Sequence, residues 1–404
     1  MVTYRTAEPQ DWAAILRTVR RTFLNEDDQG TPVDEALFEP ARAVVALDGP
    51  DVVAHAGTYS RELSVPGGAV PAGFVTAVVV AGTHRRRGVA STMLTRQLEE
   101  IRDHGDPLAV LWASEAGIYR RFGYGQASHR IGFTIDRREV QVVGAGKHTL
   151  SLRVGTPAEL RAELGTVYER VRPTRPGYAS RDDRWWTWRL HDDPGHRSGA
   201  GPLLALVCRD GDAVLGYALH RTRSEWDNLG PKGEVNVMEV VTDSPAAYAA
   251  MWDHLLNVDL TRQVSYWLAA VDEPLLHIAS DTRRLGGRYG DGLWARLLDI
   301  PAALSARRYA APVDVVLEVE DTVLPGTGGR FRLAGSLDGA ACVRTDDAPD
   351  LRLDVATLGT VYLGGNSLGS LAAAGRVEEL TSGALAAADP AFRWHRAPVS
   401  IEIF

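Results

Sequence analysis

A short basic turn between an apolar run and a helical pattern holds the residues best suited to bind a charged ligand. The apolar run covers residues 75–80, and a helix is expected soon after residue 88. The first backbone N–H groups of such a helix have no intrahelical partner, and the helix dipole places partial positive charge there. A glycine at position 88 lets a phosphate approach the backbone, while arginines attract anions. The pattern predicts a pyrophosphate site made by Arg85, Arg86, Arg87, Gly88, Val89 and Ala90.

Three consecutive arginines also occur in solvated surface turns and in patches that bind nucleic acid. Against nucleic acid, the chain has 52 Asp and Glu against 44 Lys and Arg, and its net charge is −8. The residues after the turn place Leu94, Leu98 and Ile101 on one helix face. An interior strand, a glycine-containing turn and an amphipathic helix in register favour the phosphate site over a plain surface turn.

The turn resembles the acetyl-coenzyme A signature of the GNAT N-acetyltransferases, (Arg/Gln)-x-x-Gly-x-(Gly/Ala), with Arg85, Gly88 and Ala90 in the fixed places. Acetyl transfer to an amine requires a held cofactor, a donor to the developing oxyanion, a base for the amine and an acid for the thiolate. The main chain at the end of the apolar run can meet the pantetheine arm and the thioester carbonyl. The residues expected to do so are Val78, Val79 and Val80.

Two tyrosines after the apolar run 108–112 could protonate the leaving thiolate. A tyrosine has a pKa of ~10 and a thiol a pKa of ~8.5, so the proton transfer is feasible. Tyr119 falls on a predicted helical turn, and Tyr124 stands between two glycines. Either residue could instead be a packed ring whose hydroxyl is satisfied locally.

The 404 residues are too many for one ordinary core, so two or three domains are expected. Strands and helices alternate in the first segment, and a strand followed by a helix recurs at residues 235–256 without the arginines or the glycine. We predict an α/β (α+β) chain with mixed sheets, divided at 1–147, 148–298 and 299–404. In the last segment, strands are expected at 313–319, 329–333, 341–344 and 351–355, and a helix at 378–387.

Several classes of protein are disfavoured by composition. There is no apolar run of membrane-spanning length and no signal-peptide pattern, so a cytoplasmic location without membrane contact is expected. Cys208 and Cys342 lie far apart without nearby histidines, which argues against a disulfide framework or a metal site. We therefore expect two core or subsurface thiols and no metal.

Further blocks resemble the Eis (enhanced intracellular survival) family of actinobacterial acetyltransferases, and they span all three segments. These blocks are residues 83–88, 113–119, 121–125, 291–294, 301–304 and 358–364. The resemblance implies an active GNAT domain, a second GNAT-like domain without cofactor, and a C-terminal domain similar to sterol carrier proteins. It also implies a homohexamer and broad specificity for amines, including aminoglycosides.

Carried over by motif, the resemblance makes Tyr119 the general acid and the C-terminal carboxylate of Phe404 the general base. It also assigns Ser114, in the second block, to the cofactor site. Family members active on aminoglycosides have an acidic residue before the final Phe, where this chain has Ile403. Glu26 and Asp27, in an acidic loop, are the candidates to bind a cationic substrate, although a solvated loop explains them as well.

The last residues, Ala-Pro-Val-Ser-Ile-Glu-Ile-Phe, alternate and stay apolar to the end, which is unusual for a chain terminus. An α-carboxylate has a pKa of ~3.5, so it becomes a useful base only if burial raises that pKa. Ile403 and Phe404 are expected to place and desolvate it. A strand that completes a sheet would bury Ile401 and Ile403 equally well, and would put Glu402 on the opposite face.

Two other functions are compatible with parts of the sequence. The chain could acetylate a protein lysine or N-terminus instead of a small amine. It could also be a lipid-binding protein on a degenerate scaffold, which needs an apolar tunnel in the third domain. Asp350, Arg352 and Asp354 alternate along one predicted strand, so only its other face could line such a tunnel.

Overall fold

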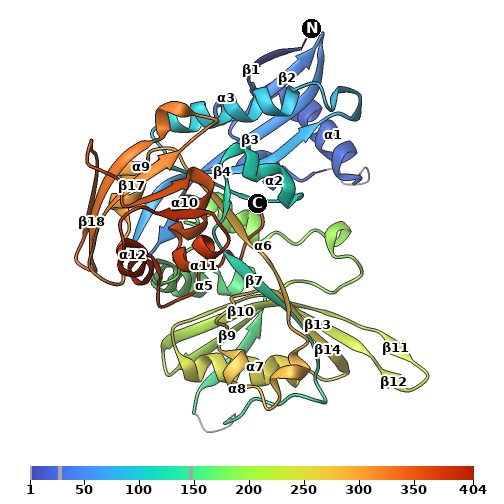
Figure 1. The fold of residues 1–404 in the computed structure, drawn as a ribbon. Coiled ribbons are helices and arrows are strands. Elements are labelled where there is room, and N and C mark those ends of the chain that lie inside the picture. Colours follow the sequence, from blue (N-terminus) through green and yellow to red (C-terminus); the bar gives the residue numbers. More distant parts are fainter. Residues whose placement is uncertain (1, 26–29, 145–148) are drawn as a thin grey trace.

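Three large β-sheets, a two-stranded hairpin and the helices packed against the sheets make up the described part of the chain (Figure 1). The structure, a computed structural model, describes residues 2–25, 30–144 and 149–404. No helix in these described ranges is long and apolar enough to cross a membrane. The C-terminus lies near β4 and α6 in the middle of the molecule (Figure 1).

The first sheet is mixed, as predicted, with strand order β1-β2-β3-β4-β5-β16-β6. Strands β4 and β5 run parallel, and α3 connects them. The predicted apolar face of α3 is confirmed, because Leu94, Leu98 and Ile101 are buried against both strands. The elements are β1 (Thr3–Thr6), α1 (Trp12–Phe23), α2 (Pro32–Leu37), β2 (Val44–Asp48), β3 (Asp51–Val65), β4 (Gly68–Val80), α3 (Val89–Asp103), β5 (Leu108–Trp112), α4 (Ala116–Tyr119), β6 (Gly125–Gln126) and β16 (Leu293–Leu297).

The second sheet has the order β15-β7-β14-β13-β10-β9-β8, with one parallel pair, β13 and β14. The predicted helix after the strand at 235–241 is α7, capped by Ser244. The elements are β7 (His129–Asp136), β8 (Ser151–Gly155), α5 (Pro157–Val171), α6 (Asp183–Leu190), β9 (Leu204–Asp210), β10 (Ala213–Arg223), the hairpin β11 (Trp226–Asp227) and β12 (Gly230–Pro231), β13 (Gly233–Thr242), α7 (Pro245–Leu256), β14 (Thr261–Ala269), α8 (Leu275–Ile278) and β15 (Arg288–Asp291).

The first two sheets exchange strands, so neither is continuous in sequence. Strand β7 precedes residue 147 but pairs with β14 and β15 in the second sheet. Strand β16 lies far beyond residue 147 but pairs with β5 and β6 in the first sheet. At the crossing, Ser128 accepts hydrogen bonds from the N–H groups of Gly292 and Leu293. The division at residue 147 remains a prediction. It separates β7 from the second sheet and β16 from the first sheet, although these strands pair there.

The third sheet, β19-β18-β17-β20-β21, carries the C-terminal domain, and the four strands predicted there are confirmed. The predicted helix at 378–387 is wrong. Residues 377–379 form the edge strand β21, and the helix begins only after Gly383, whose φ of +88° ends the preceding turn. The elements are α9 (Ile300–Ala306), β17 (Val313–Glu320), β18 (Gly329–Gly335), β19 (Ala340–Arg344), β20 (Leu351–Asp354), α10 (Val355–Tyr362), α11 (Leu368–Ala373), β21 (Val377–Glu379) and α12 (Ala384–Phe392).

The interior of this third domain is filled with side chains. Tyr309, Phe331, Tyr362 and Phe392 are fully buried, and their cluster continues into the core of the first sheet. The buried guanidinium of Arg307 donates to the carbonyl oxygens of residues 361, 362 and 392. This packing supports a domain with an occupied core rather than a lipid tunnel.

Candidate active site

A slot opens in the first sheet where β4 and β5 separate. The two strands pair in parallel only from Ala72 with Leu108 to Val75 with Leu111. Beyond this point β4 continues to Val80, with β3 on one side and no described strand on the other. Over residues 76–80, the main-chain groups that do not bond to β3 lie along this open edge, where Val78, Val79 and Val80 are predicted to meet the pantetheine arm.

A β-bulge shapes the side of the slot formed by β4. The register between β3 and β4 shifts between His55 and Gly57, and Ala77 has a φ of +48°. The buried ring of His55 bonds through Nδ1 to the carbonyl oxygen of Ala77 at 2.9 Å. Burial lowers the pKa of His55 to about 4, so the ring is neutral at pH 7 and donates this hydrogen bond. No local pattern in the sequence indicated this role of His55.

The basic turn lies at the N-terminus of α3, as predicted. Gly88 has a φ of +81° and a Cβ added there would meet nothing within 4 Å. The N-cap residue of α3 is Gly88, which has no side chain that could bond to the first N–H groups of the helix. The side chains of Arg85, Arg86 and Arg87 are exposed around them. Open backbone, free N–H groups and nearby cations together fit a pyrophosphate.

His84 holds this turn against the sheet, a role that sequence reasoning missed. Its ring is almost fully buried between the hydroxyl of Thr83, 2.8 Å from Nδ1, and the carboxylate of Asp48, 3.1 Å from Nε2. The hydrogen bond with His84 lowers the pKa of the Asp48 carboxyl. The histidine thus connects the basic turn to the end of β2.

Tyr119 ends the short helix α4, which follows β5 on the other side of the slot. Its ring stands edge-on to Tyr124, with 6.1 Å between centroids. Burial raises the pKa of Tyr119, and a hydrogen bond with Ser114 offsets part of that rise. The hydroxyl of Tyr124 is fully enclosed without a hydrogen-bond partner among the described residues. Of the two tyrosines, Tyr119 therefore has the better position for an acid.

The C-terminal residue lies at the apex of the slot. The ring of Phe404 packs edge-on against Phe74, with 4.8 Å between centroids, and Phe74 is the last residue but one of β4 to pair with β5. The tail forms no strand, contrary to one of the two interpretations of its pattern. The expectation that Ile403 anchors it is also wrong. Ile403 is 41% exposed, while Ile401 is buried.

Glu402 is buried in a network of charges that the sequence did not predict. It forms ion pairs with Arg61 of β3, at 2.7 Å, and with Arg181, which precedes α6. Arg181 also forms a bidentate ion pair with Glu239 of β13. The Nε of Arg189 donates to the same Glu239 carboxylate at 2.8 Å. Glu402 lies more than two hundred residues from both of its arginine partners in the sequence, so no local pattern indicated these ion pairs.

The charges in this network stabilise each other despite their burial. Burial alone would raise the pKa of Glu239, but Arg181 and Arg189 outweigh it and lower that pKa to about 2. The same balance, with Arg181 and Arg61, lowers the pKa of Glu402. Both carboxylates are therefore ionised at neutral pH, and removal of either would leave buried arginines uncompensated.

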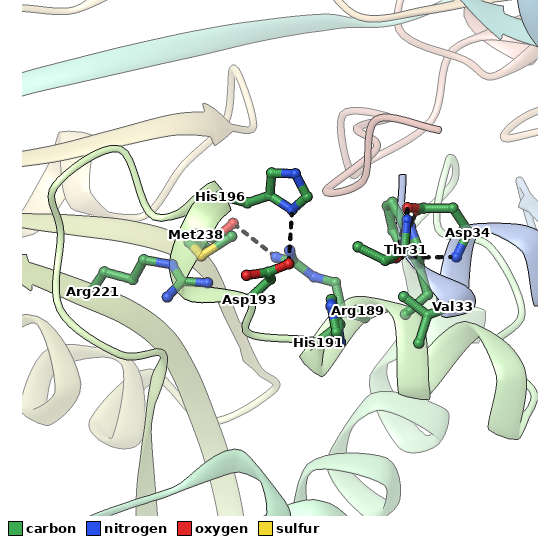
Figure 2. A pocket seen from close by; sticks show the side chains of 10 residues that line it. Thr31, Val33, Asp34, Arg189, His191, Asp193, His196, Arg221 and Met238 are labelled. Atoms are coloured by element: carbon green, nitrogen blue, oxygen red, sulfur yellow. Dashed lines mark hydrogen bonds and ion pairs between the residues drawn. The ribbon is translucent and has the colours of Figure 1, made fainter. Parts of the chain in front are cut away.

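Two cavities adjoin α6, and the second also adjoins the tail. One, of about 260 Å³, lies between α2 and the second domain, with Asp34 bonded to the indole of Trp188 and His196 facing Asp193 (Figure 2). The other, of about 290 Å³, is lined by aromatic, aliphatic and polar residues of the second domain and by the tail. Its lining includes Trp188, Met238, Trp267, Leu268, Ile401 and Ile403. Glu26 and Asp27 lie outside the described residues.

Both cysteines are buried free thiols, as expected. Within the described ranges, no three His, Cys, Asp or Glu side chains gather in a way that could hold a metal ion.

The three segments match known domain families. Residues 3–127 and residues 177–304 each match a family described as acetyltransferase (GNAT) domain, and residues 300–401 match the sterol carrier protein domain. N-acetyltransferase Eis of Mycobacterium tuberculosis is 37% identical over 406 residues, which cover 97% of this chain and 96% of the relative. The chain belongs to the Eis family of GNAT N-acetyltransferases.

Other relatives agree with this membership. An N-acetyltransferase of Streptomyces avermitilis is 44% identical over 98% of this chain and 97% of its own length. The crystal structure of Eis1 from Mycobacterium abscessus matches with a TM-score of 0.83 and 32% identity, with full coverage of both chains. The predicted order of two GNAT-like domains and a sterol-carrier-like domain is confirmed. GNAT acetyltransferases use acetyl-CoA, and this Eis-family chain is an N-acetyltransferase.

Proposed function

We propose that this Eis-family enzyme transfers the acetyl group of acetyl-CoA directly to a primary amine of a small molecule. Tyr119 is the general acid, and the C-terminal carboxylate of Phe404 is the general base. One observation carries the proposal: Phe404 lies on Phe74 at the apex of the slot between β4 and β5. A chain end held at that place has access to an amine that approaches a thioester in the slot.

The residues around the slot fit acetyl-CoA. Its pyrophosphate would meet the uncapped start of α3 at Val89 and Ala90, in the space left open by Gly88, with Arg85, Arg86 and Arg87 nearby. The pantetheine arm would bond to the main chain of Val78, Val79 and Val80. Ser114 lies beside Tyr119 at the opposite side and supports its hydroxyl.

In the proposed reaction, each transferred proton has a named donor and a named acceptor. The carboxylate of Phe404 accepts a proton from the attacking nitrogen, and Tyr119 gives a proton to the departing thiolate sulfur as the C–S bond breaks and the C–N bond forms. The proposal requires that the site exclude water from the carboxylate, because an α-carboxylate with its ordinary pKa of ~3.5 is a poor base for an amine. Burial keeps Tyr119 protonated at neutral pH, as an acid must be.

Aminoglycoside-like compounds and other polyamines are the proposed acceptors. The cavity at the tail is lined by Trp188 and Trp267, aromatic side chains of the type that attract cations. Glu26 and Asp27 are proposed to add negative charge. A panel of aminoglycosides, polyamines and lysine peptides, assayed for thiol release, separates these acceptors from the alternative, a protein lysine or N-terminus. Faster turnover of the peptides would favour that alternative.

The base assignment is tested by a protein whose Phe404 carboxylate is replaced by a carboxamide through ligation of a synthetic tail. The amide keeps the ring and removes the charge, so we expect kcat to fall about 10²-fold or more with cofactor affinity retained. The matched control is the same ligation with a free carboxylate. Full activity of the amide would remove the carboxylate from the mechanism.

We also propose a homohexamer. Large apolar side chains are exposed at the edge strand β8, at Leu152 and Val154, and on the projecting hairpin β11–β12, at Trp226 and Leu229 (Figure 1). Exposed apolar edges of this kind are typical of subunit contacts. Light scattering of the wild type and of Leu229→Asp gives the test, since a monomeric wild type would contradict the proposal.

A further inference from the structure

The second sheet contains the same separation of parallel strands as the first. Strands β13 and β14 pair in parallel up to Val237 with Tyr266. Beyond that pair β13 continues to Thr242 and β14 to Ala269 without a bond between them. In both sheets a bulged antiparallel neighbour flanks the first strand, and a helix follows it. The second domain therefore has a slot equivalent to the one that fits the cofactor in the first domain.

This second slot is occupied by the C-terminal tail. Val399 and Ile401 are 3% and 2% exposed and belong to the same core cluster as Val241 and Ala270. Small cavities beside the tail are lined jointly by the tail and by the separated ends of β13 and β14, including Val240 and Leu268. The helix start after β13 is also closed, because Ser244 caps α7 and its residue Pro245 has no N–H.

Polar contacts fix the tail at its entry to the slot. The main chain of Ala397 bonds to both members of an ion pair, donating to Asp272 and accepting from Arg175, each at 2.9 Å. The N–H of Val399 donates to the carbonyl oxygen of Pro176 at 3.0 Å. Gly177 lies so close to Val399 that a Cβ there would be 2.6 Å from its carbonyl oxygen. The backbone of the second domain is shaped around the tail.

Glu402 fixes the tail at its exit. Its carboxylate joins Arg181 of the second domain to Arg61 of the first, and the guanidinium of Arg61 lies over the ring of Trp185 at 3.8 Å. Two residues later, the ring of Phe404 packs on the ring of Phe74. The centroid of the Phe74 ring lies 5.2 Å from the guanidinium carbon of Arg61. The ion pairs therefore set the distance that the last two residues must span.

We propose that the slot of the second domain, which takes no cofactor, holds the C-terminal tail, and that Glu402 positions the terminal carboxylate by its ion pairs with Arg61 and Arg181. Glu402 touches neither the amine nor the thioester, so it is a positioning residue. The inference rests on the proposed function only for its catalytic consequence. The occupied slot and the ion pairs are independent of that function.

Carboxypeptidase A, which removes C-terminal phenylalanine, tests the position of the tail in the full-length protein. We expect wild-type Phe404 to resist release, and Glu402→Gln to lose it at least about tenfold faster, because proteolysis follows the population of the open form. The kcat of Glu402→Gln before digestion should fall about 10²-fold, as for a displaced catalytic group, with KM for acetyl-CoA unchanged. Glu402→Asp, which keeps the charge, should restore part of the protection of Phe404 and part of kcat.

The control is Asp321→Asn, which neutralises a comparably buried carboxylate, paired with Arg296 at 2.7 Å, that does not touch the tail. In Asp321→Asn, Phe404 should stay protected from release by carboxypeptidase A. A protected tail in Glu402→Gln would overturn the positioning role. A released tail with unchanged kcat would instead overturn the proposed base. If Glu402→Gln fails to fold, hydrogen exchange of wild-type Val399 decides: exchange as slow as in β13 supports the occupied slot, and fast exchange overturns it.

Discussion

The environment of Tyr119 decides its proposed role more than its identity does. Tyr119 and Tyr124 are five residues apart and in contact, but the hydroxyl of Tyr124 is enclosed, whereas Tyr119 ends the helix beside the slot and has Ser114 as a partner. Burial raises the pKa of the Tyr119 phenol, so its hydroxyl stays protonated at neutral pH and is available to the thiolate as it leaves.

We expect Tyr119→Phe to lower kcat about 10²-fold, the usual contribution of a general acid, with unchanged affinity for acetyl-CoA. Because burial raises the Tyr119 pKa above the usual value of about 10, loss of its proton should reduce wild-type kcat only above pH ~10. Steady-state kinetics from pH 6 to 10.5 measure both effects. Tyr124→Phe is the control, and an equal loss there would move the acid to Tyr124.

At the scale of elements, the strand–turn–helix unit of the first sheet was predictable and the bulge was not. The apolar run at 75–80, the glycine at 88 and the helical periodicity after it are local patterns, and the structure confirms each of them. The bulge at Ala77 depends on a buried histidine from the neighbouring strand. The network around Glu402 depends on residues from four separate elements. Such pairings leave no periodic signal in a single sequence.

Gly88 should serve the ligand more than the fold. In Gly88→Ala, the positive φ costs about 1 kcal/mol of stability, and the new methyl group enters the open space over the start of α3. We expect the Kd for acetyl-CoA to rise at least about tenfold, which is 1.4 kcal/mol. Calorimetric titration and urea unfolding measure the two effects.

Gly105→Ala is the matched control, because Gly105 follows the other end of α3, has a φ of +97° and is equally open. It should lose similar stability without loss of cofactor affinity. Equal weakening of cofactor binding by both substitutions would show that Gly88 acts only through the helix.

For the whole molecule, acid should unfold the chain partly through two buried histidines. Burial lowers the pKa of His55, in the first sheet, and of His220, in the second, to about 4 in each case. The unfolded chain binds protons at both from pH ~6.5 downward, whereas the native state does not until about pH 4. Stability therefore falls as pH decreases through this range, by about 3 kcal/mol for each histidine.

The variant His55→Asn tests this, since its amide can donate to Ala77 in place of Nδ1 but does not titrate. Between pH 7 and pH 4 it should lose about 3 kcal/mol less stability than the wild type does, measured by urea unfolding at each pH. His104→Asn, at an exposed site, should lose as much stability between pH 7 and pH 4 as the wild type does. An unchanged pH dependence in His55→Asn would contradict the account.

The exchange of strands between the first two sheets has a consequence for how the chain is made. Strand β5, one wall of the cofactor slot, remains an open edge until β16 has left the ribosome, and β7 must wait for β14 and β15. Long-range strand pairing of this kind is slow and exposes edges to aggregation. The N-terminal sheet therefore matures after the second domain has been synthesised, although the basic turn at residues 85–90 emerges long before.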